Sequence, residues 1–462
     1  MRVRIALAVL LCHFGYLRPC EADEPEEVAT FWVDPKAPAG GDGSEAHPYR
    51  TLSRALKRDG RKRIRLAPGV YRGAFELAGG TELWGPAVEL DPGDSESGGA
   101  GQKPNGTAVL VGKPLRTTLM VDGPSHVRGL RIRGGGPALW LRTGGLELRD
   151  VRIEGTGGKG LLLDPESAAV LERVAFRGTF QRAIELTGAT LEGKNLRLEG
   201  DTGLHAVRSR VDLQKLQVMK GSGVGLFCGG SVFKLREVTV RGHEYGLLSR
   251  GHCKLDVQGL WADHPDRAGL ALVESEGYLS DLKVTESGSY GGIQLLSSDL
   301  RLERFELDGG EAYGVSIRGG TIKLRAGTIK NIRDRDGGAG DGVHVRVAKV
   351  ELRAVSLIGI AGAGLLAAEE AEVEGREMTF RDIATSALWA ETGAQIRIDA
   401  GKFERLKEQW VTIPSKGQVK LVGAEVHGLS KQPFVMDCQR GARLELSRLS
   451  GDPVGALPRC AH

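Results

Sequence analysis

The chain of 462 residues is poor in aromatic side chains, which make up only 5% of it. Large aromatic rings dominate the packing of many protein cores, so the interior here must be built mainly from Leu, Val and Ile. Cysteine is scarce, with six residues in all, which excludes a small disulfide-rich scaffold. Neither charge dominates, because 63 Lys and Arg are interspersed with 59 Asp and Glu. Nucleic-acid-binding proteins carry a basic patch or stripe, so we expect no nucleic-acid partner.

Long hydrophobic runs are missing as well. The one apolar run at the start, residues 5–11, follows Arg2 and Arg4 and precedes small residues. This order is typical of an export signal, and the run is too short to cross a bilayer. We therefore expect a signal peptide at residues 1–22, no transmembrane segment, and a secreted or periplasmic bacterial protein. Lipoprotein anchoring through Cys20 is the weaker alternative, because Arg and Pro precede that cysteine.

Glycine is abundant, at 68 residues, and it marks an internal repeat. From about residue 138 onwards, a small residue followed by two alternate apolar positions recurs every 22 or so residues. Two further alternating runs follow within each unit. Such a period indicates a solenoid, and alternation with period 2 indicates strands. We interpret the glycines as turn residues that adopt positive φ at little cost. The units begin at Gly160, Ala183, Gly203, Gly225, Gly246, Gly269, Gly292, Gly314, Gly342 and Gly364, among others.

The segment before the repeat has a pattern of its own. It predicts a strand at residues 31–34, a Gly- and Pro-rich loop at 40–48, a helix at 51–57 with Thr51 as its N-cap, and a strand at 63–66. A terminal coil exposes an apolar cross-section, so a helix here is a reasonable cap.

These residues resemble the entrance of right-handed parallel β-helix proteins of the pectin-lyase-like group. The resemblance lies in residues 32–34, 47–52, 55–56, 64–71 and 83–85. It implies an all-β fold, a right-handed parallel β-helix of roughly 16 coils with a short N-terminal capping helix. The expected organisation is a signal peptide at 1–22, a strand and helix cap with an entry coil at 23–85, the β-helix at 86–450 with a long loop at 91–106, and a tail at 451–462.

The alternation also assigns faces. The third position of each unit should point outwards, and in stacked coils these side chains lie about 4.8 Å apart. Many of them are apolar or aromatic, Phe227 and Trp389 among them. We interpret this column as a binding strip for ligand or partner, unless loops fold over it and bury it. Tyr245, Tyr290 and Tyr313 precede unit starts, where they either stack on sugar rings or shield a turn.

One unit is overlong, and it contains the candidate catalytic group. The coil that starts at Gly314 has about six extra residues, within 331–341. Insertions in a solenoid map to loops, often on the binding face. This one brings Asp334, Asp336 and Asp341 beside His344 and Arg346, with Arg318 one coil below.

Those residue types suit acidic glycans. Asp334 and Asp336 could bind Ca²⁺, the arginines could neutralise a uronate, and His344 could act as acid or base. The opposite interpretation is a hydrated surface loop, since the diagnostic motifs of β-helix enzymes are missing.

Four cysteines remain after removal of the signal peptide. Cys438 and Cys460 lie one coil apart, and we predict a disulfide between them that fixes the C-terminal end. For Cys228 and Cys253, a diagonal bridge and two buried thiols both fit the alternation.

Two functions remain open at this stage. The first is a monomeric exported β-helix protein whose long outer face binds a polysaccharide or a cell-surface protein without catalysis. The second is a polysaccharide lyase, epimerase or glycoside hydrolase that acts on acidic glycans near His344. Whether the chain is an enzyme is therefore undecided, because fold does not choose between these functions.

Overall fold

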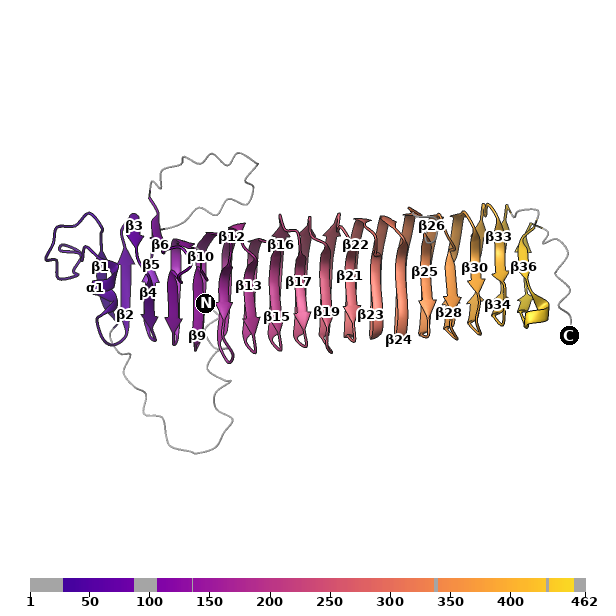
Figure 1. Ribbon diagram of the computed structural model, residues 1–462, viewed down its shortest axis with the longest axis horizontal. Coiled ribbons are helices and arrows are strands. Elements are labelled where there is room, and N and C mark those ends of the chain that lie inside the picture. The colour runs from indigo at the N-terminus through magenta and orange to yellow at the C-terminus, as the bar shows by residue number, and fades with distance from the viewer. Residues whose placement is uncertain (1–27, 87–105, 135, 336–339, 429–431, 453–462) are drawn as a thin grey trace, which may run out of the picture.

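The computed structural model describes residues 28–86, 106–134, 136–335, 340–428 and 432–452. The predicted signal peptide and nearly all of the predicted 91–106 loop lie outside these residues. The described chain winds into a right-handed parallel β-helix, as predicted, and it is an elongated stack with the N-terminal coil at one end (Figure 1). In the part of the chain described, no helix is long and apolar enough to cross a membrane.

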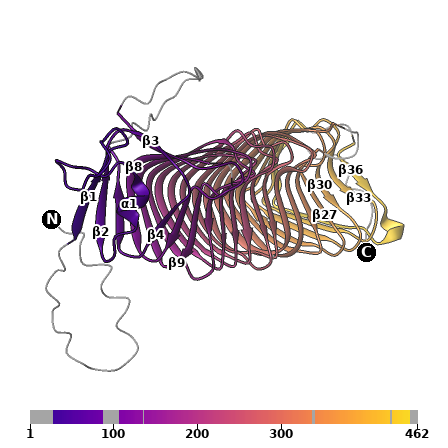
Figure 2. The same ribbon diagram turned by 60° about the vertical axis from the view of Figure 1, so that its left-hand side comes forward.

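Each coil has three strand segments, which we call its first, second and third strands. The first strands pair in order along the stack to form one face (Figure 2). They are β4 (Phe75–Ala78), β7 (Leu119–Asp122), β9 (Leu139–Thr143), β11 (Lys159–Leu163), β13 (Arg182–Thr187), β15 (Thr202–Val207), β17 (Val224–Gly229), β19 (Tyr245–Arg250), β21 (Ala268–Val273), the opening parts of β23 (Gly291–Glu311) and β24 (Tyr313–Arg333), β25 (Asp341–Arg346), β27 (Leu365–Ala368), β30 (Ser386–Ala390), β33 (Gln409–Ile413) and β36 (Phe434–Met436).

The second and third strands of most coils are continuous. They form the remainder of β23 and β24 and the strands β8 (Ser125–Gly134), β10 (Gly145–Thr156), β12 (Ala168–Thr179), β14 (Thr190–Glu199), β16 (Arg210–Met219), β18 (Val232–Arg241), β20 (Lys254–Asp263), β22 (Glu276–Ser287) and β26 (Lys349–Ile360). Towards both ends they separate. The second strands are then β1 (Ala29–Val33), β2 (Lys62–Leu66), β5 (Thr81–Trp84), β28 (Glu372–Arg376), β31 (Gln395–Asp399), β34 (Gln418–Val422) and β37 (Arg443–Ser447). The third are β3 (Gly69–Arg72), β6 (Ala108–Val111), β29 (Thr379–Ile383), β32 (Lys402–Glu404), β35 (Glu425–His427) and β38 (Ser450–Gly451).

The coils stack in parallel and in register, so that equivalent residues form columns. Leu161 pairs with Ile184, Ile184 with Leu204, and Leu204 with Leu226. These inward residues are fully buried, and the same holds along the length of the stack. The core is therefore a continuous column of mainly aliphatic side chains, as expected from the low aromatic content, with aromatic rings such as Phe403 and Trp410 packed together towards the C-terminal end.

The second and third strands meet at a corner with left-handed backbone. One residue there has positive φ in each coil, and most of these residues are not glycine. They include Asp150 (φ 54°), Arg173 (φ 52°), Lys215 (φ 56°) and Glu237 (φ 55°). A residue with a Cβ in this region costs about 1–2 kcal/mol, and the hydrogen-bonded coils on either side hold it there. The sequence did not reveal this corner, because charged residues give no turn signal.

The glycines at the unit starts have a different role from the one predicted. Gly203, Gly225, Gly246 and Gly269 do not have positive φ. A Cβ at Gly225 would lie 2.3 Å from Cγ1 of Val240 and 2.9 Å from the Gly246 carbonyl oxygen. In these coils the glycine of the first strand thus lies too close to the inward side chain at the end of the third strand of the same coil to carry any side chain of its own. The interpretation as positive-φ turn residues is wrong for these positions, and the reason is space.

The N-terminal segment begins the stack. The helix α1 (Leu52–Leu56) buries Leu52 and Ala55 and contacts β1, β2 and β4. Thr51 occupies the N-cap position, but its side chain makes no capping hydrogen bond, so the predicted cap is wrong in that detail. That α1 closes the end of the stack stays a prediction.

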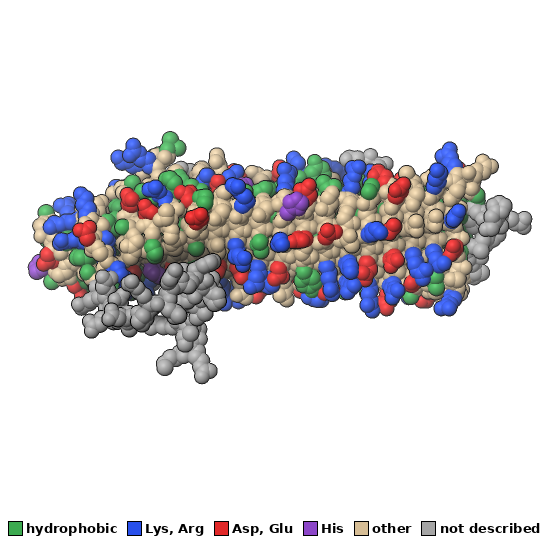
Figure 3. Space-filling model, turned by 90° about the horizontal axis from the view of Figure 1, so that it is seen from below, with side chains coloured by type: hydrophobic (Ala, Val, Ile, Leu, Met, Phe, Trp, Pro, Cys, Tyr) green, Lys and Arg blue, Asp and Glu red, His purple; other side chains and the backbone are tan. Residues whose placement is uncertain are grey.

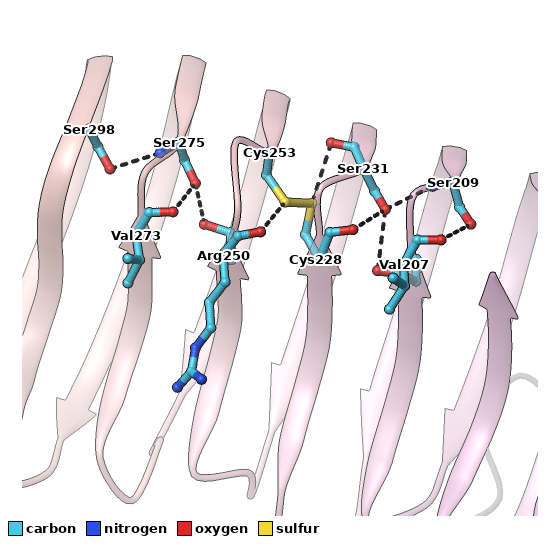
Figure 4. The surroundings of a disulfide bond; sticks show 12 residues. Val207, Ser209, Cys228, Ser231, Arg250, Cys253, Val273, Ser275 and Ser298 are labelled. Atoms are coloured by element: carbon cyan, nitrogen blue, oxygen red, sulfur yellow. Dashed lines mark hydrogen bonds between the residues drawn. A yellow bond between two sulfur atoms is a disulfide. The ribbon is translucent and has the colours of Figure 1, made fainter. Parts of the chain in front are cut away.

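In the middle of the stack, a ladder of inward serines lies where successive coils enter their second strands (Figure 4). The Ser209 hydroxyl donates to the Val207 carbonyl at 2.7 Å, and the Ser231 hydroxyl accepts from the Ser209 N–H at 3.0 Å. Ser275 and Ser298 repeat this arrangement at 3.1 Å. The ladder thus gives the buried Ser209 and Ser275 N–H groups hydrogen-bond acceptors at this corner.

Cys253 replaces serine in this ladder and forms a disulfide with Cys228 of the preceding coil. The sequence left the state of this pair open. One coil further on, Ser249 and Ser275 occupy the corresponding positions, and their hydroxyls hydrogen bond at 2.7 Å. The disulfide therefore joins two positions that are joined one coil later by a hydrogen bond between serines. Both cysteines are fully buried.

Replacement of Gly225 by Ala tests the steric role of the glycines. We expect Gly225→Ala to lower the free energy of unfolding by about 1–3 kcal/mol, because overpacking forces the core apart. Gly145→Ala is the matched control, since no atom lies within 4 Å of a Cβ built there. Chemical denaturation of the two variants measures the difference, and equal losses would contradict the proposed role.

Candidate functional site

The outward column of the first strands has the register that the sequence predicted. We call it the first-strand strip. Its members pair one above the next through fourteen successive coils, over about 60 Å at 4.8 Å per coil. They are Trp140, Leu162, Glu185, His205, Phe227, Leu248, Ala271, Gln294, Ser316, His344, Leu366, Trp389, Thr412 and Val435.

The first-strand strip has far fewer charged side chains than the outward column of the second strands. Of its members only Glu185 is a carboxylate, and most are apolar or aromatic. The outward column of the second strands is nearly all charged instead, and Lys234 pairs there with Asp212 at 2.9 Å. Figure 3 shows such mixed charges over much of the visible surface. The second-strand members are Glu147, Val170, Glu192, Asp212, Lys234, Asp256, Tyr278, Arg301, Lys323, Glu351, Glu374, Arg397, Lys420 and Glu445.

The aromatic members of the strip are half-buried. The Phe227 ring stacks on the His205 ring of the coil below, with 4.6 Å between centroids and 12° between planes. The indole Nε1 of Trp389 donates to Glu391 at 3.1 Å. Since neighbours above and below hold them, these rings present a fixed apolar surface.

The three tyrosines do not form one ladder. Tyr245 and Tyr290 lie 6.4 Å apart between centroids, and the Arg267 guanidinium lies over both rings at 6.0 and 5.5 Å. Tyr313 instead packs its ring against His344, with 5.2 Å between centroids. The predicted binding role of all three stays a prediction, but only Tyr245 and Tyr290 share a site.

Three polar atoms on the strip have no hydrogen-bond partner among the described residues, although they are buried. They are Nε1 of Trp140, Nδ1 of His205 and Oγ1 of Thr412. An unsatisfied buried polar atom costs about 1–3 kcal/mol, and because these three atoms have almost no exposed surface they are not open to a docked ligand.

The surroundings of His205 on the strip favour its uncharged form. Burial lowers the pKa of His205, and the nearby Arg182 cation lowers this pKa further, while Glu185 opposes both effects. A lowered histidine pKa favours the neutral ring at neutral pH.

The predicted catalytic residues converge in part. His344 Nδ1 lies 2.8 Å from Oδ2 of Asp341, and Arg346 donates its Nε–H to His344 Nε2 at 2.9 Å. The second carboxylate oxygen of Asp341 accepts the N–H of Ala363 at 2.8 Å. Because Nε2 accepts, Nδ1 carries the ring proton and donates to Asp341. His344 is only 7% exposed, so both ring nitrogens are engaged within a buried cluster.

Arg318 joins this cluster indirectly. It pairs in register with Arg346, one coil apart as predicted. Glu369 lies between them, 3.9 Å from Arg318 and 3.6 Å from Arg346. The carboxylate offsets one of the two arginine charges, and sequence spacing did not indicate it because it belongs to a later coil.

The described residues contain no cluster of ligands that would support the predicted Ca²⁺ site. Among the described residues, no group of three or more His, Cys, Asp or Glu side chains could hold a metal ion. Asp334 is described, whereas Asp336 lies outside the described residues, so the Ca²⁺ site stays a prediction. The same holds for the second disulfide, since Cys438 begins the short 3-10 helix η1 (Cys438–Arg440) but Cys460 is not described.

Sequence reasoning missed a groove on the third-strand face. It has a volume of about 840 Å³ and runs across seven consecutive coils between Arg152 and Lys283. The alternation that defined the first-strand strip also defines the outward residues of this face. The signal was therefore present in the sequence, but the charged residues were taken for a solvated surface.

Comparison with known proteins gives only structural neighbours. No protein-family model and no curated protein match the chain. It is similar to a family 28 exopolygalacturonase of Yersinia enterocolitica, with 12% identity and a TM-score of 0.34 over 77% of this chain and 76% of that chain. It is also similar to tailspike protein 3 of bacteriophage CBA120, with 10% identity and a TM-score of 0.34 over 92% of this chain and 62% of that chain.

A third neighbour is pectate lyase Pel9A, with 11% identity and a TM-score of 0.19 over 90% of this chain and 78% of that chain. These neighbours are parallel β-helix proteins of the pectin-lyase-like group, the group that the N-terminal segment resembles. The fold of this chain is established by its own strand register, and nothing below depends on these similarities.

Removal of the Asp341 carboxylate tests whether the cluster stabilises the fold. We expect Asp341→Ala to lower the free energy of unfolding by about 2–3 kcal/mol, because the Ala363 N–H and the His344 Nδ1–H both lose a buried acceptor. Asp341→Asn keeps an acceptor oxygen and should lose less. Denaturation curves measure both variants, and a neutral Asp341→Ala would contradict a structural role.

Proposed function

We propose that the protein is exported and binds a polysaccharide along the first-strand strip without cleaving it. The observation that carries the proposal is the strip itself, a straight in-register column of mostly uncharged side chains on an otherwise charged surface. Contiguous apolar surface of this kind is typical of binding sites. A linear polymer with a regular repeat suits a surface whose own repeat is the spacing between coils.

The chemistry of the strip fits sugars. A sugar ring has apolar faces that pack on fixed aromatic rings such as Phe227 and Trp389, as in other aromatic contacts. It also carries hydroxyls that both donate and accept. Those hydroxyls match the partly exposed polar side chains of Gln294 and Ser316 on the strip. A protein partner would not need this mixture at regular intervals, so a glycan is the better match.

Export is supported by the disulfide. Cys228 and Cys253 are bonded in the core, and structural disulfides persist in oxidising compartments such as the periplasm and the cell exterior. The predicted signal at residues 1–22 agrees with this placement.

The binding proposal is tested by removing the aromatic rings. We expect Phe227→Ala combined with Trp389→Ala to weaken polysaccharide binding about tenfold or more, because each ring contributes about 0.5–1.5 kcal/mol beyond its buried area. Titration calorimetry with neutral and acidic polysaccharides measures the affinity. Tyr278→Ala is the matched control, because this half-buried aromatic belongs to the second-strand column.

Two results would contradict the proposal. One is an affinity that the double variant leaves unchanged. The other is an equal loss in Tyr278→Ala, which would mean that the effect does not depend on the strip.

Cleavage of an acidic glycan at His344 is the second candidate. One observation favours it, namely that Asp341 and Arg346 each hydrogen bond to a ring nitrogen of His344. A general base needs a free lone pair close to the proton it removes. Here Arg346 occupies Nε2, and the groove lined by the third strands lies on another face. Binding without cleavage is therefore the better supported function.

An assay for unsaturated and reducing-end products separates the two candidates. If the protein only binds, acidic and neutral polysaccharides should stay intact after long incubation with the wild type. Product that forms with the wild type and disappears in His344→Gln would establish the enzymatic function. Product that persists in His344→Gln would place cleavage elsewhere and contradict both candidates.

A further inference from the structure

The groove on the third-strand face, which we call the third-strand groove, is built by the repeat. Each of its five central coils contributes the same three positions, namely the corner residue with positive φ, the inward residue after it and the next outward residue. Small residues keep it open, since Ala175 and Gly259 line it. Its length, seven coils at about 4.8 Å each, is close to 30 Å.

The groove is lined by more cations than acids. Its cationic side chains are Arg152, Arg173, Arg177, Arg197, Lys215 and Lys283, and its acidic ones are Glu237 and Asp281. Five of the six cations come from four consecutive coils. Opposite charges nearby fix some of the arginines, as Arg173 pairs with Asp150 at 2.6 Å and Arg197 with Glu199 at 3.3 Å.

Two lysines have their charges available. Lys215 and Lys283 are exposed and form no ion pair with any described residue. Lys283 lies 5.6 Å from the centroid of the Trp261 ring, and Arg241 lies 4.6 Å from the same ring. The Trp261 Nε1 donates to Thr285 at 3.3 Å. The indole is therefore fixed, and it keeps Lys283 at the C-terminal end of the groove.

Neutral hydrogen-bonding side chains lie between the cations. Asn195, Gln217 and Thr239 line the groove in successive coils. Amides and hydroxyls of this kind both donate and accept, which suits a ligand that carries hydroxyls as well as negative charges.

We propose that the third-strand groove is a second binding site, for a linear anionic polysaccharide with spaced carboxylate or sulfate groups. It lies on a different face from the first-strand strip, so it does not depend on the proposed function of that strip. A chain with one charge per one or two sugars would place anions near Arg197 and Lys215 and again near Lys283. Lys215 and Lys283 are three coils, or about 14 Å, apart.

A nucleic acid fits the groove less well. Its backbone charges are dense, so some would lie against Glu237 and Asp281. Trp261, held by Arg241 and Thr285, is the one aromatic ring that lines the described groove, whereas single strands are usually bound on several stacking rings. Spaced charges avoid the two acids and leave the neutral side chains for hydroxyls.

The test compares two polymers of equal length, polygalacturonate and its neutral methyl ester, on the intact protein. We expect Lys215→Gln combined with Lys283→Gln to bind polygalacturonate about tenfold more weakly, since each exposed charge pair contributes up to about 1 kcal/mol. Its binding should also depend less on salt. Lys234→Gln combined with Lys254→Gln on the second-strand face removes the same charge and should leave the affinity unchanged.

The outcomes separate the two sites. Loss of methyl-ester binding in the strip variant Phe227→Ala/Trp389→Ala, with polygalacturonate binding retained, would leave the groove proposal intact. An unchanged polygalacturonate affinity in the groove variant would overturn it. An equal loss in the two lysine pairs, or tighter binding of single-stranded DNA than of polygalacturonate through the same lysines, would overturn it as well. Equal thermal midpoints would verify that all variants are folded.

Discussion

The structure depends on one constraint, the parallel and in-register pairing of successive coils. Each residue lies directly over its counterpart about 4.8 Å away. The side chain at one position of a coil therefore packs against the side chain at the same position of the next coil. The disulfide illustrates this, since Cys228 and Cys253 make the contact that Ser249 and Ser275 make one coil later. The same pairing holds charged residues such as Lys215 in left-handed backbone at the corner.

Register also explains why the faces differ. In the charged column, neighbours of opposite sign form ion pairs between coils, as Asp212 and Lys234 do. A column of uncharged members has no such ion pairs, and its rings stack on one another instead, as His205 and Phe227 do. The surface therefore divides into lengthwise columns that differ in how many of their side chains are charged. A ligand that follows the stack would meet the same chemistry along its length, which favours polymers over small molecules.

The sequence predicted the fold well because both of its periods are local. The period of 22 residues and the alternation of 2 assign almost every strand residue to a face, and the outward column from Trp140 to Val435 follows directly. The predicted role of the unit-start glycines was wrong because their true role depends on the contact between Gly225 and Val240. These residues belong to different strands of one coil, and a local sequence pattern does not give the distance between them. The place of Glu369 between two arginines was missed for the same reason.

The His344 cluster shows how proximity alone can mislead. Overlong turns and clustered Asp, His and Arg residues are found at active sites, but they also arise where an insertion must be anchored to a regular stack. Here Asp341 binds the backbone of the following coil through Ala363 and orients His344, while Arg346 occupies the other ring nitrogen. Each bond fixes the loop and leaves fewer groups for a substrate. Saturation of its own hydrogen bonds therefore argues against acid or base chemistry at His344, although this residue belongs to the first-strand strip, and it agrees with the proposed binding without cleavage.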